Sequence, residues 1–437
     1  MPANPSTPNP IPSDPGLPLL GHALSTVTET LEFLRGWQPY FLARRARHGG
    51  VFRTNIGAPA ITLLDPVAVG AALDVTKVRK RYGFGPRKPR PALVGDIVPV
   101  MFSNDAEHDQ LKGMVLTLMR RRFGLLSGIY AEIAPAWRAR LMAAGPCDGA
   151  QAIEDLLADL VFRWLLGLEK GPSAADLRGW LDTLLAPRFA PWPTATDRVM
   201  AGSYARLVTL ARASPVVVDL PDADLQAAGV DRDQLARHLL FVAGFNAWSG
   251  LRGLLASMAA ELSTWSDEAR AAARTTADPW RPTGENAALQ RIVLETLRLH
   301  PPAPIVFGEA RADFALPTST GTVEVKAGEL LMSVLSLAQR DPSLGDPDVF
   351  RPDRFADPTL AARSLYWAGG PDGVPTGATN TVCPGQDVVP AIARAFCADW
   401  LTLDVAVAEP PRWSTITMVQ ANRPENGLRL TRVSART

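Results

Sequence analysis

The sequence predicts a mainly α-helical fold with small β-sheets, and three observations point to it. Of the 437 residues, 47% are hydrophobic and 20% are charged, which is a globular composition with material for a large core. Helical periodicity recurs in long stretches, whereas the alternation typical of strands is confined to short ones. The longest helical pattern, residues 231–265, would span about 50 Å at 1.5 Å per residue, enough to cross the centre of a domain.

The bulk properties exclude several classes of protein. A formal net charge of +1 gives no broad field for nucleic acid or an anionic membrane. Three cysteines are too few and too scattered for a disulfide framework, so we expect a reducing, cytoplasmic setting. No apolar signal segment opens the chain, and no uncharged apolar run is long enough to predict a transmembrane span. We expect a flexible, proline-rich leader at residues 1–15 and a single domain at 16–437.

The first half of the chain is predicted to contain helices and one pair of strands. The segment 31–48 has helical spacing and ends in basic residues followed by Gly49 and Gly50, a typical helix stop. Residues 51–64 alternate and predict two short strands. Further helices are expected at 67–73, 106–119, 130–144, 151–168 and 200–213.

A basic segment rich in glycine and proline lies at 79–91. A solvated loop is the simpler interpretation. The alternative is that one of its cations meets a substrate carboxylate.

The central helical pattern contains unusual residues. Gly244, Gly250 and the polar Asn246 lie in its middle, although each glycine costs a helix roughly 1 kcal/mol. Close approach of a flat ligand would explain them, and so would tight helix–helix packing.

In the last third, a helix at 286–299 is halted by Pro301 and Pro302, and short strands follow over 304–329. Glu295 and Arg298 are three positions apart and share one helix face. A lone cysteine, Cys383, lies just before a helical pattern. Free backbone N–H groups there favour a thiolate, and haem iron is a metal that one protein cysteine can hold. A buried, inert thiol is the alternative.

Three motifs occur in order: Glu295-Thr-Leu-Arg298, Phe350-Arg-Pro-Asp-Arg354-Phe and Cys383-Pro-Gly385. Together they resemble the cytochrome P-450 superfamily. The resemblance implies a haem-thiolate domain with a long central helix over the haem, and heme b (iron protoporphyrin IX) ligated by Cys383. It also implies a buried ionic network of Glu295, Arg298 and Arg354 behind the haem.

Several positions depart from an ordinary monooxygenase of that superfamily. The acid–alcohol pair that relays protons to iron-bound dioxygen is matched by Asn246 and Ala247, which can supply neither an acidic proton nor a hydroxyl. The usual propionate-binding arginine after the first motif is matched by Gly308. The usual aromatic residue, glycine and arginine before the cysteine are replaced by threonines, which are Thr376, Thr379 and Thr381.

These departures resemble one branch, the allene oxide synthases and hydroperoxide lyases. That branch has a Phe-Asn-x-Trp-x-Gly stretch, matched here by residues 245–250, and an Asn-x-x-Cys ending, matched by Asn380 to Cys383. Other matches are Trp367 to Pro371, residues 307–313, 325–329 and 340–342, and the start at 10–18. This chain differs from the branch at Pro384 and Pro304. No plastid transit peptide is recognised, so we expect a non-plant member.

The resemblance implies that polyunsaturated fatty-acid hydroperoxides are rearranged without O2, NADPH or a redox partner. Dehydration to an allene oxide is the first expectation. A hydroperoxide lyase or an epoxyalcohol synthase is the alternative on the same substrates. Alternative functions of other classes are a hydrogen-peroxide-driven hydroxylase, a reductase-dependent monooxygenase and a non-enzymatic haem sensor.

The resemblance also assigns roles to individual residues. Asn246 would hold the peroxide oxygens, and Phe102 would lie where synthases have Phe and lyases have Leu. The alignment is shorter by two residues there, so Met101 is an alternative and Phe102 is then core filling. Lys112, and less surely His108, would pair with a haem propionate in place of the missing arginines. Asn380 and Gly385 belong to the loop that carries Cys383.

Overall fold

The computed structural model describes residues 10–13, 21–56, 58–81, 94–184, 195–365, 367, 375–413 and 424–436. Most of the predicted leader at 1–15 lies outside these ranges, as do residues 82–91 of the basic segment and residues 368–371 of one matched motif.

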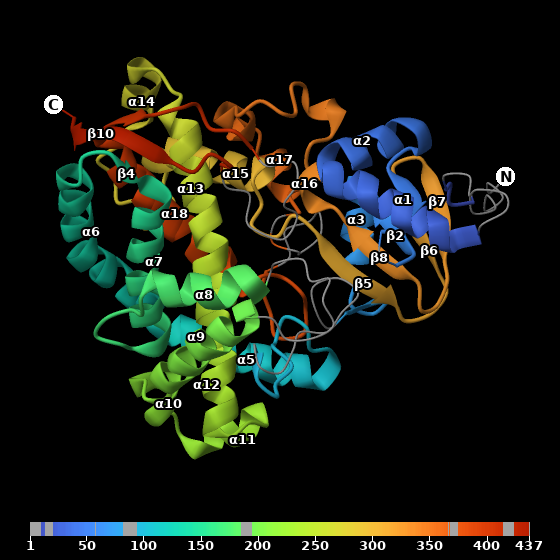
Figure 1. The fold of residues 1–437 in the computed structure, drawn as a ribbon, viewed down its shortest axis with the longest axis horizontal. Helices are drawn as coiled ribbons and strands as arrows, with labels where there is room; N and C mark the ends of the chain where they lie inside the picture. Colours follow the sequence, from blue (N-terminus) through green and yellow to red (C-terminus); the bar gives the residue numbers. More distant parts are fainter. Residues whose placement is uncertain are drawn as a thin grey trace.

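The protein has a helical part and a part built on a β-sheet (Figure 1). The sheet part holds the first helices of the chain, and the last strand lies at the far end of the helical part. The prediction of a mainly helical fold with small sheets is confirmed.

The helices and short helical turns include most of the chain. Those up to the central helix are α1 (Gly21–Arg35), α2 (Trp37–His48), α3 (Pro66–Ala72), α5 (Asp105–Arg122), η1 (Phe123–Leu125), α6 (Leu126–Ala143), α7 (Gly149–Leu166), α8 (Ala174–Leu184), α9 (Ala195–Arg212), α10 (Pro215–Val218) and α11 (Asp222–Ala228). The rest are α12 (Arg232–Phe241), η2 (Val242–Trp248), α13 (Ser249–Ser263), α14 (Asp267–Ala273), η3 (Gly284–Asn286), α15 (Ala287–Leu299), α16 (Leu335–Ala338), η4 (Pro342–Leu344), η5 (Pro352–Ala356), α17 (Pro358–Ala362), η6 (Pro384–Gln386) and α18 (Val388–Leu401).

The strands form three small sheets. The largest has the order β1-β2-β8-β5-β3, in which only β2 and β8 are parallel. A second has the order β4-β10-β9, and β6 pairs with β7 in a hairpin. The bounds are β1 (Val51–Thr54), β2 (Ala60–Leu63), β3 (Val78–Lys80), β4 (Cys147–Asp148), β5 (Val306–Ala310), β6 (Phe314–Thr318), β7 (Gly321–Val325), β8 (Leu330–Ser333), β9 (Leu403–Val407) and β10 (Arg429–Ala435).

One predicted helix is two helices in the structure. The pattern over 31–48 contains the end of α1 and all of α2, because Gly36 adopts φ 171° and ψ 107° and interrupts the helix. The predicted stop is confirmed: Gly49 has φ 82°, and its N–H donates to the Arg45 carbonyl.

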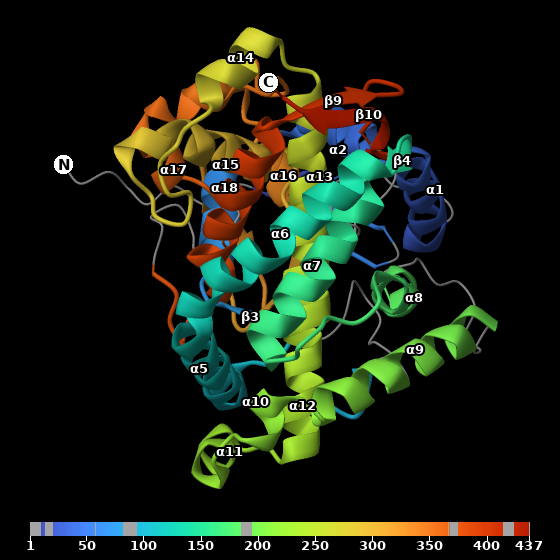
Figure 2. The same cartoon turned by 90° about the vertical axis from the view of Figure 1, so that its left-hand side faces the viewer.

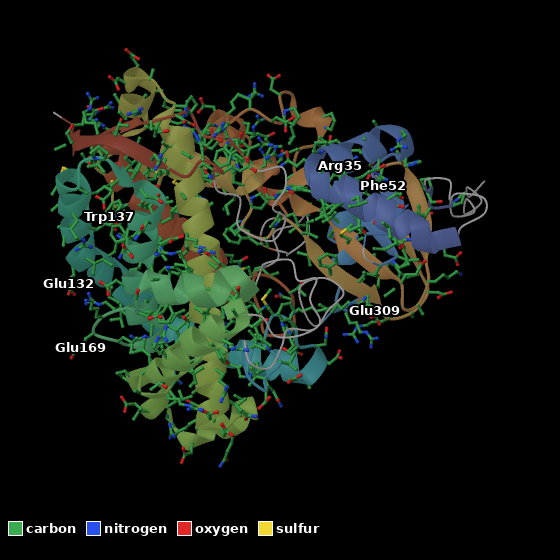
Figure 3. The ribbon with its side chains drawn as sticks, in the orientation of Figure 1. Arg35, Phe52, Glu132, Trp137, Glu169 and Glu309 are labelled. Carbon is green, nitrogen blue, oxygen red and sulfur yellow. The ribbon has the colours of Figure 1, made fainter. Side chains whose placement is uncertain are left out.

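The hydrophobic core follows the same division. A large cluster of buried side chains fills the helical part, and two smaller clusters lie around the sheet. In Figure 3, Trp137 lies among the helices and Phe52 at the sheet. Both side chains are almost fully buried, so each part has its own packed interior.

The central helix runs through the helical part as α12, η2 and α13 in one continuous column (Figure 2). It begins with a capping box, in which Asp231 accepts from the Gln234 N–H and the Gln234 side chain accepts from the Asp231 N–H. Among the described residues, the stretch 232–263 is long and apolar enough to span a membrane, but most of it is buried inside the protein. It is therefore the core helix that the sequence predicts.

Candidate functional site

The middle of the central helix is a π-helical segment, η2, that carries Asn246. π-Helical turns are rare and frequently mark functional sites, because the wider turn re-aims side chains. Between Leu235 and Ser263, a stretch described without gaps, Asn246 is the one exposed side chain. An accessible amide at the centre of a buried helix indicates that it faces open space for a ligand.

The residues before α5 approach this amide. The Asn246 Nδ2 lies 3.6 Å from the Met101 Sδ, the distance of an N–H···S hydrogen bond. Phe102 is buried, and its ring packs edge-on against Phe241 with 6.2 Å between centroids. The side chain of Met101 thus contacts Asn246 in this structure.

Helix packing explains one of the two central glycines. A Cβ at Gly244 would lie 2.6 Å from the Trp180 ring of α8, so a larger residue would clash there. A Cβ at Gly250 would make only an ordinary contact with Pro302. The packing alternative is therefore sufficient for Gly244.

A buried polar network holds the end of η2. The Trp248 indole N–H donates to the Glu154 carbonyl oxygen of α7 at 2.9 Å. The Arg252 guanidinium lies over the Trp248 ring, pairs with the Glu154 carboxylate at 3.3 Å and contacts Asp182 of α8. Both Glu154 and Arg252 are about 4% exposed, so the network ties α7, α8 and the central helix together in the interior.

The cysteine predicted to hold iron lies immediately before η6 and α18. The Gly385 N–H donates to the Cys383 sulfur at 3.3 Å, and a Cβ at Gly385 would come within 3.4 Å of that sulfur. Burial raises the pKa of the Cys383 thiol, although the Gly385 N–H and the Lys112 charge act in the opposite direction. Burial thus outweighs the effect of the helix start, which the sequence predicted to favour the thiolate. Bound haem iron would stabilise the deprotonated sulfur.

Asn380 organises the loop before the cysteine. Its side-chain oxygen accepts from the N–H groups of Gly377 and Val382, both at 3.2 Å, and its amide donates to the Pro375 carbonyl at 3.0 Å. These bonds give the Asn-x-x-Cys pattern a physical reason, because one amide side chain fixes the backbone on both sides of itself.

Lys112 of α5 fastens this loop to the helical part. Its Nζ donates to the Val382 carbonyl at 2.7 Å, to the Asn380 side-chain oxygen at 3.1 Å and to the Asn380 carbonyl. The residue is about 3% exposed, and its pKa is lowered to about 8 because burial disfavours the charge, while Cys383 acts in the other direction.

Lys112 lies within a cluster of basic side chains. Burial and the nearby Lys112 lower the pKa of Lys80 to about 7. Burial, with the charge of Lys80, also lowers the pKa of His108, whose ring nitrogen lies 3.0 Å from the Asp109 carboxylate. Asn104 holds Lys80 in place by bonds of 2.8 and 3.0 Å to its backbone. Sequence reasoning named Lys112 and His108 but did not single out Lys80 from its basic segment.

The three charged residues of the first two motifs meet in the structure. The Glu295 carboxylate accepts from Arg298 at 2.7 and 2.8 Å and from Arg354 at 3.0 Å. It also accepts from the Arg351 N–H at 2.8 Å. Glu295 is fully buried, and such a charge persists only because it is paired.

Gly308 lies in β5, where the strand approaches β3. A Cβ at Gly308 would come within 2.3 Å of the Val78 side chain. The close pairing of these strands therefore excludes an arginine at this position.

These features fit haem b. Cys383 offers one thiolate ligand, which is sufficient for haem iron. Asn246 supplies an accessible face on a central helix, and a basic cluster borders the cysteine loop, where cations can neutralise propionates. This set of donors thus suits haem b.

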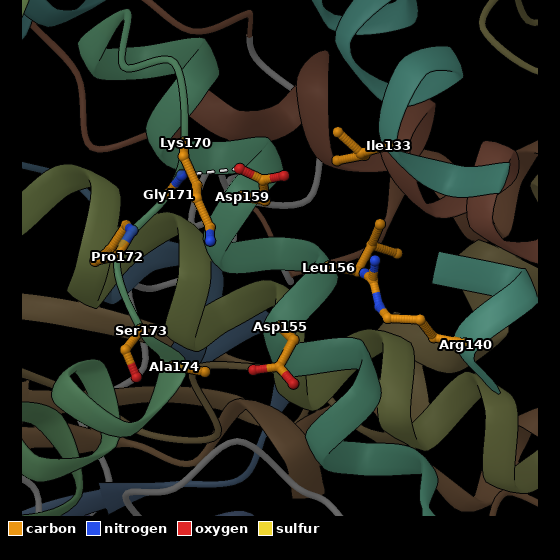
Figure 4. Close-up of a pocket in the computed structure, with 10 residues that line it drawn as sticks. All are labelled: Ile133, Arg140, Asp155, Leu156, Asp159, Lys170, Gly171, Pro172, Ser173 and Ala174. Atoms are coloured by element: carbon orange, nitrogen blue, oxygen red, sulfur yellow. Dashed lines mark hydrogen bonds between the residues drawn. The ribbon is translucent and has the colours of Figure 1, made fainter. Parts of the chain in front are cut away.

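A separate hollow of about 580 Å³ lies between α6, α7 and the segment before α8 (Figure 4). The Gly171 N–H donates to Asp159 at its edge at 2.8 Å. Arg140 and Lys170 line it together with Asp155, so its charges are mixed. None of the predicted site residues lines it.

Comparison with curated proteins gives relatives along nearly the whole chain. Allene oxide synthase 3 of Oryza sativa is 29% identical, with 90% of each chain covered. The chloroplastic linolenate hydroperoxide lyase of Arabidopsis thaliana is 25% identical, with 89% of this chain and 88% of the relative covered. A divinyl ether synthase of Selaginella moellendorffii is 26% identical, with 89% of each chain covered. No family model matches the chain.

Solved structures agree with the fold. Cytochrome P450SP alpha superimposes with a TM-score of 0.72 at 18% identity, covering 93% of this chain and 99% of the other. A variant of cytochrome P-450 OleT, solved with arachidonic acid, gives a TM-score of 0.75 at 16% identity, covering 98% and 99%.

Along about nine tenths of its length the chain is similar to plant allene oxide synthases and hydroperoxide lyases, and it has the fold of the solved cytochrome P-450 structures. The predicted resemblance to this superfamily and branch is therefore confirmed, and heme b is the cofactor that it implies. The comparisons do not test the non-plant origin that we expected.

Proposed function

We propose that this cytochrome P-450 rearranges polyunsaturated fatty-acid hydroperoxides without dioxygen or a reductase, by dehydration to an allene oxide. The observation that carries the proposal is the pair Asn246–Ala247 in the π-helical segment of the central helix. The accessible side chain there is a neutral amide, and the next residue has no hydroxyl. A site lined by these two residues suits a substrate that already contains an O–O bond.

The residues around the cofactor have distinct roles in this proposal. Cys383 would ligate the iron, His108 and Lys80 would face the propionates, and Lys112, whose three N–H donors bind the cysteine loop, would hold that loop in place. The bound haem would supply the redox centre that cleaves the O–O bond of the hydroperoxide. Because Lys112 also donates to the Val382 carbonyl at 2.7 Å, it would couple the position of the cysteine loop to that of α5.

Asn246 would orient the hydroperoxide. Its N–H groups can donate to a peroxide oxygen, while its carbonyl can accept the peroxide proton. The amide has no proton to release near neutral pH, so it would position the O–O bond without protonating it. This arrangement differs from the delivery of protons to bound dioxygen by an acid–alcohol pair.

One observation favours the lyase alternative on the same substrates. The aliphatic Met101 contacts Asn246, whereas the Phe102 ring packs into the core against Phe241. If an aromatic face promotes oxidation of a substrate radical, a thioether in the position next to Asn246 would favour carbon–carbon cleavage. The product therefore discriminates between the two outcomes.

The same proposal places the protein in a reducing compartment, the cytoplasm, and requires no redox partner. The cysteines Cys147, Cys383 and Cys397 are all free, which suits the cytoplasm. The Arabidopsis relative is named as chloroplastic.

The proposal is tested with the haem-loaded chain and linoleic acid hydroperoxide in the absence of reductant. We expect Asn246→Leu to lower kcat/KM by about 100-fold, because the positioning amide is lost while the volume is nearly kept. Asn246→Gln should retain part of the rate. Equal turnover by Asn246→Leu and the unaltered chain would contradict the role of the amide.

A further inference from the structure

The sulfur of Met101 and the amide of Asn246 share one hydrogen bond. The Sδ–Nδ2 distance is 3.6 Å, and the sulfur accepts from the amide N–H. Met101 is half-buried beside the main core cluster, whereas Asn246 is accessible. A thioether is a weak acceptor, so a better acceptor that reaches Asn246 can displace it.

A hydroperoxide held by Asn246 would lie directly against this sulfur. Thioethers are soft nucleophiles, and their oxidation to sulfoxide is a common reaction of methionine. Holding the two reactants together converts a slow bimolecular reaction into one that competes with turnover.

We propose that Met101 is a modification site, at which the bound fatty-acid hydroperoxide oxidises the thioether to the sulfoxide. The sulfur lone pair attacks the terminal peroxide oxygen, and the O–O bond breaks with its electron pair on the inner oxygen. The proton on the transferred oxygen passes to the resulting alkoxide. Sulfide is oxidised to sulfoxide, and hydroperoxide is reduced to the hydroxy fatty acid. The inference rests on the hydroperoxide binding of the proposed function.

The modification would limit the enzyme's own activity. A sulfoxide oxygen is a far stronger hydrogen-bond acceptor than a thioether, and it projects from the atom that already contacts Asn246. It would hold the amide that the next substrate requires. Activity should therefore decline with the number of hydroperoxide molecules encountered, and methionine sulfoxide reductase should restore it.

Peptide mass spectrometry of the haem-loaded, full-length chain tests the inference. The protein is treated with a few equivalents of linoleic acid hydroperoxide, and one added oxygen is measured on two methionines. Met142 of α6 is the internal control, because its side chain is 38% exposed and lies outside the site. We expect Met101 to be modified about tenfold faster than Met142 with this probe, although it is less exposed. With hydrogen peroxide, which needs no lipid site, Met142 should react first.

The experiment separates this inference from the proposed function. Product formation with Met142 oxidised as fast as Met101 overturns the inference and leaves the function standing. Selective oxidation of Met101 without any rearranged product supports the inference and contradicts the function. As a second variant, Met101→Leu keeps the side-chain volume, and its activity should no longer respond to methionine sulfoxide reductase. Recovery of that variant with the reductase would also overturn the inference.

Discussion

Trp248 donates its indole N–H to the backbone carbonyl oxygen of Glu154 across 2.9 Å, at the point where the π-helical segment returns to α-helix. Trp248 is fully buried and is covered by the Arg252 guanidinium at 4.5 Å from its ring. This contact fixes the end of the segment that carries Asn246 two residues earlier. It gives a physical reason for the tryptophan in the Phe-Asn-x-Trp-x-Gly pattern.

Replacement of the Trp248 indole donor should lower activity more than it lowers stability. Trp248→Phe keeps a large ring but removes the indole donor to the Glu154 carbonyl, which lies inside α7 and keeps its helical partner, so the cost to stability should be about 0.5–1.5 kcal/mol. We expect a lower kcat for hydroperoxide turnover, measured at saturating substrate, because Asn246 loses its fixed orientation. Trp265→Phe, at a half-buried position two residues after the end of α13, is the matched control. Equal kcat values in the two variants would contradict the positioning role.

Lys112 should be needed for haem retention. Lys112→Met removes the Lys112 donor to the Asn380 carbonyl and one of two donors to the Val382 carbonyl, which also accepts from the Thr376 hydroxyl, so we expect the free energy of unfolding to fall by about 1–3 kcal/mol. The purified variant should also contain less haem per chain, measured by the absorbance of the haem band. Lys326→Met, at an exposed ion pair with Asp313, should change neither quantity. Full haem content in Lys112→Met would refute the anchoring role.

The Glu295 network should be structural and costly to break. Glu295→Gln removes the charge that two buried arginines share, and truncating one partner of such a network typically costs 3–5 kcal/mol. Urea denaturation should show this loss as a lower midpoint. Glu309→Gln, which affects the exposed pair with Arg79, is the control and should have a small effect. Similar midpoints for both variants would be inconsistent with a buried network.

His238 of α12 should make the protein sensitive to acid. Burial lowers its pKa to about 4, so between pH 6.5 and 4 the unfolded chain binds a proton that the native protein does not. The free energy of unfolding should fall by roughly 3 kcal/mol as the pH drops through this window. His238→Leu should flatten that decline in urea titrations at pH 7, 5.5 and 4. An unchanged decline in the variant would rule out His238 as its source.

Much of the fold could be predicted because its signals are local. The proline pair after α15, Gly49 after α2 and the periodicity of 231–265 each specify a boundary or an element through nearby residues. The interruption at Gly36 was missed, because a single glycine within continuous helical spacing is compatible with one helix or two. The π-helical segment was missed for a related reason: its sequence has the apolar spacing of an ordinary helix.

The parts of the site that depend on distant contacts could not be predicted. Lys80 reaches the neighbourhood of Lys112 only because β3 pairs with β5 and Asn104 holds its backbone. Likewise, the neighbours Met101 and Phe102 turn to opposite surroundings, one toward Asn246 and the other toward Phe241. A sequence comparison that is uncertain by one residue cannot decide between them. Residues within one motif, such as Asn380 and Cys383, could be named from the sequence because their spacing along the chain is itself the signal.

The central claim is that the substrate is a hydroperoxide, which already contains an O–O bond, and that the Asn246 amide binds it in the active site. The most direct measurement is anaerobic incubation of the haem-loaded chain with linoleic acid hydroperoxide, without NADPH or any reductase, followed by product identification. The account predicts rapid consumption of the hydroperoxide and an allene oxide, recovered as its ketol hydrolysis products, or aldehydes if cleavage prevails. Consumption only in the presence of dioxygen, NADPH and a redox partner would contradict it.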